Sequence, residues 1–130
     1  MNTSTTAAAT QLTGRLLLSV IFIMAGITKI GAFVGTQGYM ESMGVPGALL
    51  PLVIALEIGG GLTLLLGWQT RLVALLLAGF CLVTAALFHS NFADQLQMAM
   101  FLKNLGLAGG FLTLYVHGSG GMSLDSRQGT

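Results

Sequence analysis

The sequence predicts an all-α, polytopic membrane protein built as a bundle of four transmembrane helices. Of the 130 residues, 54% are hydrophobic and only 7% are charged, whereas a soluble domain normally has about a quarter of its residues charged. Five Lys or Arg and four Asp or Glu residues are too few to cover a surface that faces water. Four apolar stretches are each long enough to cross about 30 Å of hydrocarbon, which takes about 20 helical residues.

The four spans are expected within one membrane domain that fills the chain (1–130), at residues 12–33, 46–66, 70–89 and 94–117. Thr13 is suited to cap the first helix. Pro51 suits the first turn of the second helix, and Gly67 suits its C-terminal cap. The fourth helix is expected to start with "DQLQ" at 94–97, which resembles a capping box.

Two segments outside the spans are polar enough to lie at or beyond the membrane surface. The connector 31–44 contains "YMESM", which is expected to form a short interfacial helix with Tyr39, Met40 and Met43 facing the bilayer or a pocket mouth. The tail 118–130, which is rich in Gly and Ser, is expected to be loosely ordered.

Basic residues near the ends of the spans predict the orientation. Arg15, Arg71 and Arg127 fall on one side of a four-span chain, and the opposite connectors carry Glu41 and Asp94. Because cytoplasmic loops are enriched in Lys and Arg, both termini are expected in the cytoplasm, with Trp68 anchoring that interface. The competing interpretation is that the first segment is a cleaved signal peptide. Its removal would leave three spans and spoil the charge asymmetry, so we interpret it as a true span.

Four ionisable residues are predicted in the outer half of the bundle. Lys29, Glu57 and Lys103 lie about 7 to 16 Å deep when residues are counted from the outer ends of their spans, and His89 closes the third span at the outer surface. Charge at the centre of a membrane span costs about 2.5 to 3.5 kcal/mol on insertion scales and often marks a functional site. A buried carboxylate needs a partner, so Glu57 is expected to pair with Lys29, Lys103 or both. The protonation state of Glu57 depends on opposing effects, because lysines lower its pKa and burial raises it.

The faces of the predicted helices support this arrangement. At helical spacing, Lys29 shares a face with Ser19, Phe22 and Gly26, and Glu57 shares one with Gly60, Gly61 and Leu64. His89 continues the stripe of Ala78, Leu82 and Ala85, and Lys103 is followed by Gly106 and Gly110. Small residues let helix backbones approach in lipid. The glycines expected to serve packing, with pocket lining as a second possibility, are Gly26, Gly60, Gly61, Gly106 and Gly110.

The ionisable cluster has a purely structural interpretation and a functional one. In the first, the charges only fix the register of the bundle. In the second, a surplus of positive charge around one carboxylate accepts an anion or an electron-rich oxygen, such as a quinone carbonyl or a phenolate. His89 near the outer mouth would then exchange protons with water, although a histidine at the end of a span is commonly just an interfacial residue.

Other classes of function lack support in the sequence. A net charge of +1 without a basic cluster argues against nucleic-acid binding, and the single cysteine, Cys81, excludes an intramolecular disulfide. No CxxC or HExxH pattern is present. His89 and His117 are expected at opposite membrane faces, so they do not jointly ligate haem or a metal.

Several motifs in this order resemble the DoxX family: "GITKIGAF" at 26–33, "YMESMGVPG" at 39–47, "LEIGGGLTLLLGWQTR" at 56–71, "LFHSNF" at 87–92, "FLKNL" at 101–105 and "GSGGMSLD" at 118–125. The resemblance covers roughly residues 12–125. It implies a four-helix bacterial inner-membrane protein with relatives connected to quinone-linked oxidation and to oxidative stress. The positions that match the family pattern are Lys29, Glu57, His89 and Lys103, with Asn104 beside the last. The resemblance supplies no settled mechanism, and no catalytic residue is assigned.

The sequence therefore leaves three hypotheses for the function. The favoured one is a redox-associated protein that binds a membrane quinone or similar aromatic at Lys29, Glu57, His89, Lys103 and Asn104. The second is a non-catalytic anchor or assembly partner for an oxidoreductase, using the tail and the "YMESM" connector. The third is a small transporter or proton pathway, for which a homo-oligomer would supply the symmetry that four spans lack. Membrane lipid is the one partner that all three share, and enzyme status is left open.

Overall fold

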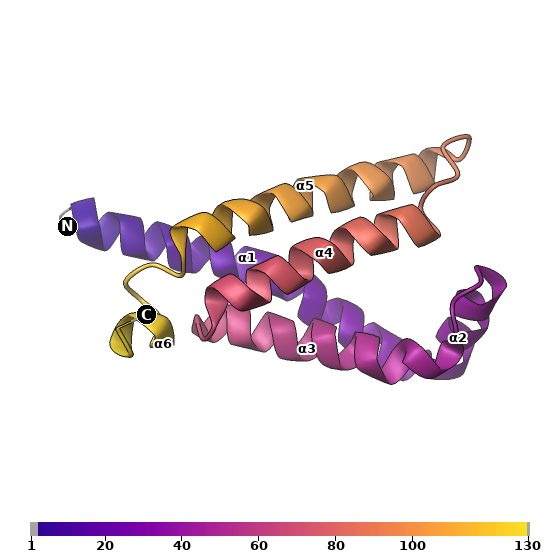
Figure 1. Cartoon of the computed structure of the whole chain (residues 1–130), viewed down its shortest axis with the longest axis horizontal. Helices are drawn as coiled ribbons and strands as arrows, with labels where there is room; N and C mark the ends of the chain where they lie inside the picture. Colours follow the sequence, from indigo (N-terminus) through magenta and orange to yellow (C-terminus); the bar gives the residue numbers. More distant parts are fainter. Residues whose placement is uncertain (1–2, 130) are drawn as a thin grey trace. The chain divides into compact units, whose positions relative to one another are not determined.

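The computed structural model describes residues 3–129, and all regular secondary structure in that range is helical (Figure 1). The elements in chain order are α1 (Thr3–Gly31), α2 (Phe33–Ser42), the 3₁₀ helix η1 (Gly47–Leu49), α3 (Leu50–Leu66), α4 (Thr70–Phe88), α5 (Gln95–His117) and α6 (Leu124–Arg127). Four segments are long and apolar enough to cross a membrane: Ser4–Gly31, Gly47–Leu66, Thr70–Phe88 and Gln95–His117. The prediction of an all-α fold with four membrane-spanning helices is confirmed.

The chain divides into two compact units. The first comprises residues 1–69 and 119–130, so it holds α1, α2, α3 and, from the far end of the sequence, α6. The second comprises residues 70–118 and is a hairpin of α4 and α5 (Figure 1). The single membrane domain expected from the sequence stays a prediction.

The first helix begins earlier than the expected span. α1 starts at Thr3 rather than near Leu12, so Thr13 lies in its interior and is not an N-cap. The Thr13 hydroxyl instead donates to the carbonyl of Ala9 at 2.8 Å, and Thr10 donates to Thr6 in the same way. Threonine can bond back to the preceding turn in this manner, so the predicted cap is wrong.

The other predicted helix ends are close to those observed. Pro51 lies in the first turn of α3, and Gly67 ends that helix in the left-handed conformation with φ of 72°. At α5, the Asp94 side chain accepts from the backbone N–H of Leu96 at 2.9 Å. The second half of the expected capping box is absent, because the Gln97 side chain accepts from the backbone N–H of Asn91 instead of Asp94.

The connector between the first two spans forms a helix, as expected. α2 is longer than "YMESM", and the Gln37 amide donates to the Gly47 carbonyl at 3.0 Å, which ties it to η1. Tyr39 and Met43 are exposed, whereas Met40 is buried, so Met40 does not share the expected face towards the bilayer or a pocket mouth.

The polar tail is ordered, contrary to expectation. Ser119, Ser123 and Asp125 are buried, and the Ser123 hydroxyl caps α6 by accepting from the backbone N–H of Ser126 at 3.1 Å. The backbone N–H of Asp125 donates to the Gly67 carbonyl at 2.8 Å. A segment rich in Gly and Ser was expected to be loosely ordered. Its buried polar residues Ser123 and Asp125 instead make the hydrogen bonds given above.

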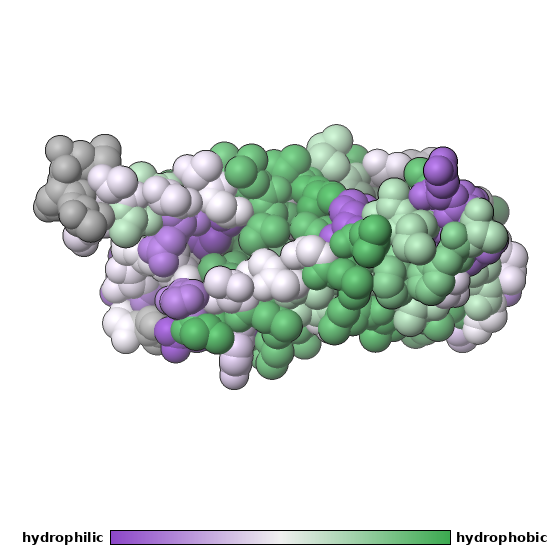
Figure 2. Space-filling view, turned by 90° about the horizontal axis from the view of Figure 1, so that it is seen from above, coloured by the Kyte–Doolittle hydropathy of each residue, from purple (hydrophilic) through white to green (hydrophobic). Residues whose placement is uncertain are grey.

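Much of the surface is apolar, as lipid contact requires. The face shown in Figure 2 is largely coloured hydrophobic. Exposed leucines lie on all four long helices, for example Leu17, Leu52, Leu76 and Leu102. In water such exposure would favour aggregation, so the surface agrees with the four candidate spans.

Candidate functional site

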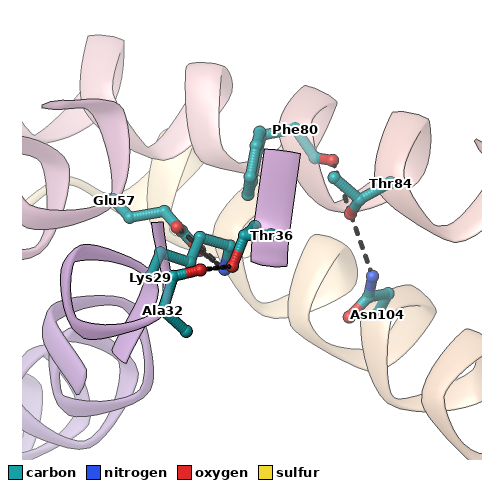
Figure 3. Close-up of polar contacts among 7 residues, drawn as sticks. All are labelled: Lys29, Ala32, Thr36, Glu57, Phe80, Thr84 and Asn104. Carbon is teal, nitrogen blue, oxygen red and sulfur yellow. Dashed lines mark hydrogen bonds and ion pairs between the residues drawn. The ribbon is translucent and has the colours of Figure 1, made fainter. Parts of the chain in front are cut away.

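The first unit holds a charged pair between α1 and α3. Lys29 Nζ lies 3.0 Å from Glu57 Oε1 and 3.1 Å from Glu57 Oε2 (Figure 3). The Glu57 side chain is 4% exposed and that of Lys29 is 30% exposed. The predicted pairing of Glu57 is thus confirmed for Lys29, and the lysine is the member of the pair that faces outward.

Close packing of α1 on α3 brings the pair together. A methyl group on Gly26 would overlap the Ile58 side chain, and one on Gly61 would lie 2.6 Å from Ile23 Cγ1 and 3.1 Å from the Ser19 carbonyl. The expected inward faces are confirmed here, since Ser19, Phe22, Gly26, Glu57, Gly60, Gly61 and Leu64 are all buried. Gly26 lies three residues before Lys29, so the tight crossing sits one helical turn from the ion pair.

Glu57 Oε1 has an incomplete set of partners. This atom is buried and accepts no hydrogen bond of good geometry from the residues that the structure describes, although the Lys29 ammonium is 3.0 Å away. Buried polar atoms normally find a hydrogen bond. The carboxylate therefore depends on a single cation for its compensation.

The second unit holds a neutral polar pair between α4 and α5. Asn104 Nδ2 donates to Thr84 Oγ1 at 3.1 Å, and the Thr84 hydroxyl lies 2.9 Å from the carbonyl of Phe80, to which it donates (Figure 3). Asn104 is 8% exposed. Sequence reasoning selected Asn104 as a neighbour of Lys103 and gave Thr84 no role.

Lys103 and the glycines of α5 lie on another side of that helix. The buried residues of α5 are Asn104, Ala108 and Phe111, whereas Lys103, Gly106 and Gly110 are exposed in this structure. The face of α5 that is buried in the second unit is therefore offset by one position from the face predicted to point inward. On α4, Ala78 and Ala85 are buried as expected, but Leu82 is 45% exposed.

His89 lies just beyond the end of α4, where its backbone N–H donates to the Ala85 carbonyl at 3.1 Å. Partial burial lowers the pKa of His89, and the positive charge of Lys103 lowers it further. The neutral imidazole is therefore favoured, which leaves one ring nitrogen able to accept a proton. Lys103 and His89 thus influence each other within the second unit.

A buried arginine in the first unit was missed as an interaction centre. Arg15 was expected at the mouth of the first span, but it is 1% exposed. Its Nη1 donates to the carbonyls of Leu64 and Leu65 at 3.1 and 3.0 Å, and its Nη2 donates to the Met122 carbonyl. A cation at the C-terminal end of a helix is favourable because the last carbonyls lack partners. An arginine within an otherwise apolar helix was the available sequence signal.

No group of three or more His, Cys, Asp or Glu residues that suits a metal ion occurs within residues 3–129. Cys81 is buried and forms no disulfide within the part of the chain that the structure describes. The two units together contain all the predicted site residues: Lys29 and Glu57 in the first, and His89, Lys103 and Asn104 in the second. Their joint action on a ligand stays a prediction.

Comparison with known proteins places the chain in a family. The family described as DoxX matches residues 10–90, which is more than half of the chain. Inner membrane protein YqjF of Escherichia coli strain K12 is 56% identical over 114 residues, covering 88% of each chain. Inner membrane protein YphA of the same strain is 37% identical over 123 residues, covering 89% of this chain and 88% of the relative.

A more distant relative has a name that points to chemistry. The putative oxidoreductase CatD of Bacillus subtilis strain 168 is 31% identical over 64 residues, which is 49% of this chain and 48% of the relative. No solved structure gives a significant match. The four apolar spans and the named inner-membrane relatives make this a multi-pass inner-membrane protein. From the family match and these identities, the chain belongs to the DoxX family.

Proposed function

We propose that this protein binds a membrane quinone, or a similar aromatic molecule with oxygen substituents, as part of a redox process. The observation that carries the proposal is the asymmetric burial of the Lys29–Glu57 pair. The Glu57 side chain is enclosed, and the Lys29 side chain is 30% exposed. A cation held in a membrane-spanning helix by a buried counter-charge is suited to an electron-rich oxygen.

The Lys29 ammonium has the donors that such a ligand needs. It carries three N–H donors. One donates to Glu57 Oε2 at 3.1 Å, and Glu57 Oε1 lies 3.0 Å from the same nitrogen, so we count two donors as directed at the carboxylate. The third is then available to a carbonyl or phenolate oxygen of the ligand. When that oxygen gains negative charge on reduction, a fixed cation in a low-dielectric site stabilises it. Glu57 keeps the lysine charged and oriented.

The second unit has polar groups of its own. Lys103 is exposed and would donate a hydrogen bond to a ligand oxygen, and His89 would exchange protons with the outer aqueous phase. Electrons would pass to or from a partner protein or a second bound organic molecule. The name of the Bacillus subtilis relative, a putative oxidoreductase, supports a redox setting over the half of the chain that it matches.

The test is to quantify the aromatic molecules that co-purify with the protein. Wild type, Lys29→Gln, Lys29→Arg and the control Arg127→Gln are extracted in a mild detergent, and their bound small molecules are measured by native mass spectrometry. Wild type and Arg127→Gln are expected to carry a species of quinone mass. Lys29→Gln is expected to lose at least about tenfold of it, since 1.4 kcal/mol of lost binding corresponds to a factor of ten. Lys29→Arg keeps the charge and should retain part of the binding.

Other outcomes identify the alternatives. Equal quinone occupancy in wild type and Lys29→Gln would reject this site. An apo protein that co-purifies with an oxidoreductase would support an anchoring role instead. Ion or proton flux in proteoliposomes that stops in Glu57→Gln would support a transport pathway. A folding check by thermal unfolding of each variant separates lost binding from lost structure.

A further inference from the structure

The tail of the chain forms an unusual surface at one end of the first unit. Residues 119–127 run beside the turn that follows α3, and three of their polar side chains, those of Ser119, Ser123 and Asp125, face inward. Ser119, Ser123 and Asp125 are 7 to 8% exposed, whereas Met122 is 42% and Leu124 is 36% exposed. A tail that faced water would show the reverse pattern, with polar groups outside and apolar groups covered.

Hydrogen bonds fix the depth of this tail relative to the end of a span. The apolar segment Gly47–Leu66 is long enough to cross the membrane and ends at Leu66. The next residue, Gly67, accepts from the backbone N–H of Asp125, and Gln69 N donates to Asp125 Oδ1, both at 2.8 Å. The tail is therefore held within a few residues of the membrane boundary instead of extending into water.

Contacts on its inner side hold the tail in this position. Arg15 donates to the Met122 carbonyl while it also binds the last carbonyls of α3. The Ser119 and Ser123 hydroxyls lie 2.7 Å apart. Gly120 lies against the Gln11 side chain, at a backbone φ of 84° that favours glycine. The apolar side chains are thus turned outward by a defined inner surface.

We propose that residues 119–127 are an interfacial anchor whose partner is the headgroup layer of the membrane that the protein spans. The surface concerned consists of Leu66, Trp68, Met122, Leu124 and Arg127, and we call it the tail surface. Leu66 is 56% and Trp68 43% exposed at the same end of α3. Trp side chains favour the membrane interface. Arg127 is exposed in the last turn of α6 and matches the phosphate groups of lipids.

The inference stands independently of quinone binding. Lipid is favoured over a protein partner because the tail surface continues the lipid-facing side of a span at its boundary. An apolar face with basic residues that lies in the interface plane binds through buried apolar area and through attraction to anionic lipids. One arginine adds a modest electrostatic contribution, so most of the binding rests on the apolar side chains.

The first experiment measures depth with spin labels in vesicles. Single cysteines at Met122 and Leu124 are labelled in a Cys81→Ala background, and their accessibility to oxygen and to a water-soluble nickel chelate is compared. Leu17, 69% exposed within α1, gives the hydrocarbon reference, and Ala93, exposed in the α4–α5 loop, gives the aqueous one. Labels at 122 and 124 are expected to favour oxygen over nickel, between the two references. Values equal to those at Ala93 would overturn the proposal.

A second arm tests the lipid phosphate. Phosphatidylglycerol added to phosphatidylcholine vesicles is expected to lower the nickel accessibility at 124 in the otherwise wild-type chain, and Arg127→Gln should abolish that gain. Inorganic phosphate added to pure phosphatidylcholine vesicles should change nothing. An equal response to free phosphate would overturn the assignment to lipid. Because each label could itself release the tail, agreement between positions 122 and 124 is required, and disagreement counts against the proposal.

Discussion

In the α1–α3 hairpin a lysine and a glutamate meet between the helices, whereas in the α4–α5 hairpin an asparagine amide meets a threonine hydroxyl. The two hairpins share one other feature. In each, an arginine from the first long helix lies against the glycine that follows the second long helix. Arg15 lies at Gly67, and Arg71 lies at Gly118. The same architecture thus carries a charged contact in one unit and a neutral contact in the other.

The difference between the charged and the neutral pair helps to separate contacts that helix packing requires from contacts that need another explanation. Neutral polar pairs between membrane helices are worth about 0.6 kcal/mol on average, and the pair between α4 and α5 is of this kind. A buried ion pair is often no more stabilising than apolar residues of similar volume. Helix association alone therefore gives little reason for a buried Lys29–Glu57 pair, which agrees with the binding role proposed above.

The largest effect is expected from leaving one charge without its partner. Lys29→Met removes the one cation that compensates the buried Glu57 carboxylate, so we expect a loss of about 4 kcal/mol in the free energy of unfolding. The double variant Lys29→Met, Glu57→Gln should recover most of that loss. Reversible unfolding in bicelles measures both. A single variant as stable as wild type would mean that the pair is not buried in the membrane.

Arg15→Lys should have the next largest effect. Lysine keeps the charge but lacks the planar, forked guanidinium that lets Arg15 reach three carbonyls. At least one charged hydrogen bond is therefore lost, at a cost of about 2 kcal/mol. The matched variant in the second hairpin is Arg71→Lys, and it should cost less because Arg71 is exposed. The same unfolding assay compares them. Equal losses would remove the distinction between the two arginines.

Glycine substitutions should affect the two hairpins in opposite directions. Gly61→Ala forces a methyl group against Ile23 and the Ser19 carbonyl, and overpacking of this kind costs about 1 to 3 kcal/mol. Gly106→Ala meets no atom within 4 Å and should stabilise α5 slightly, because alanine favours helix over glycine. A destabilised Gly106→Ala would indicate that this face packs against another helix in the membrane.

Asn104→Leu should have a small effect on stability. It removes the hydrogen bond to Thr84, so we expect a loss of about 0.6 kcal/mol in the unfolding free energy. Thr84 can still donate to the Phe80 carbonyl. Quinone retention in the same variant tells whether Asn104 also contacts a ligand. A loss of unfolding free energy as large as that of Lys29→Met would contradict the contrast between the hairpins.

The smallest effect is the pH response of His89. Burial and the charge of Lys103 place its folded pKa below the usual value of about 6.5. The folded state therefore binds this proton less readily than the unfolded state. The contribution of His89 to stability is complete above about pH 6.5 and decreases as the pH falls from there towards the folded pKa. Lys103→Met should raise the folded pKa in an NMR titration of the imidazole, and an unchanged value would exclude this charge effect.

Sequence patterns predicted the spans well because long apolar runs, Pro51, Gly67 and Asp94 act locally. They also predicted that Glu57 pairs with Lys29, Lys103 or both, since a buried carboxylate needs a cation in lipid, and the structure shows the pair with Lys29. The start of α1 was missed because Thr3–Gln11 lacks an apolar stripe, although its alanines favour helix. The role of Arg15 was missed because its partners, the carbonyls of Leu64, Leu65 and Met122, are backbone groups far along the chain and leave no side-chain signature.

The tail also sets an order of events during synthesis. Residues 119–127 complete the unit that α1 and α3 begin, yet the ribosome makes them only after α4 and α5. Until then, Arg15 lacks its bond to Met122, and Gly67 lacks its bond from Asp125. The first hairpin therefore lacks these two contacts while the second hairpin is synthesised. A chain that stops before Ser119 would lack these two contacts permanently, so its first hairpin would stay without them in the membrane.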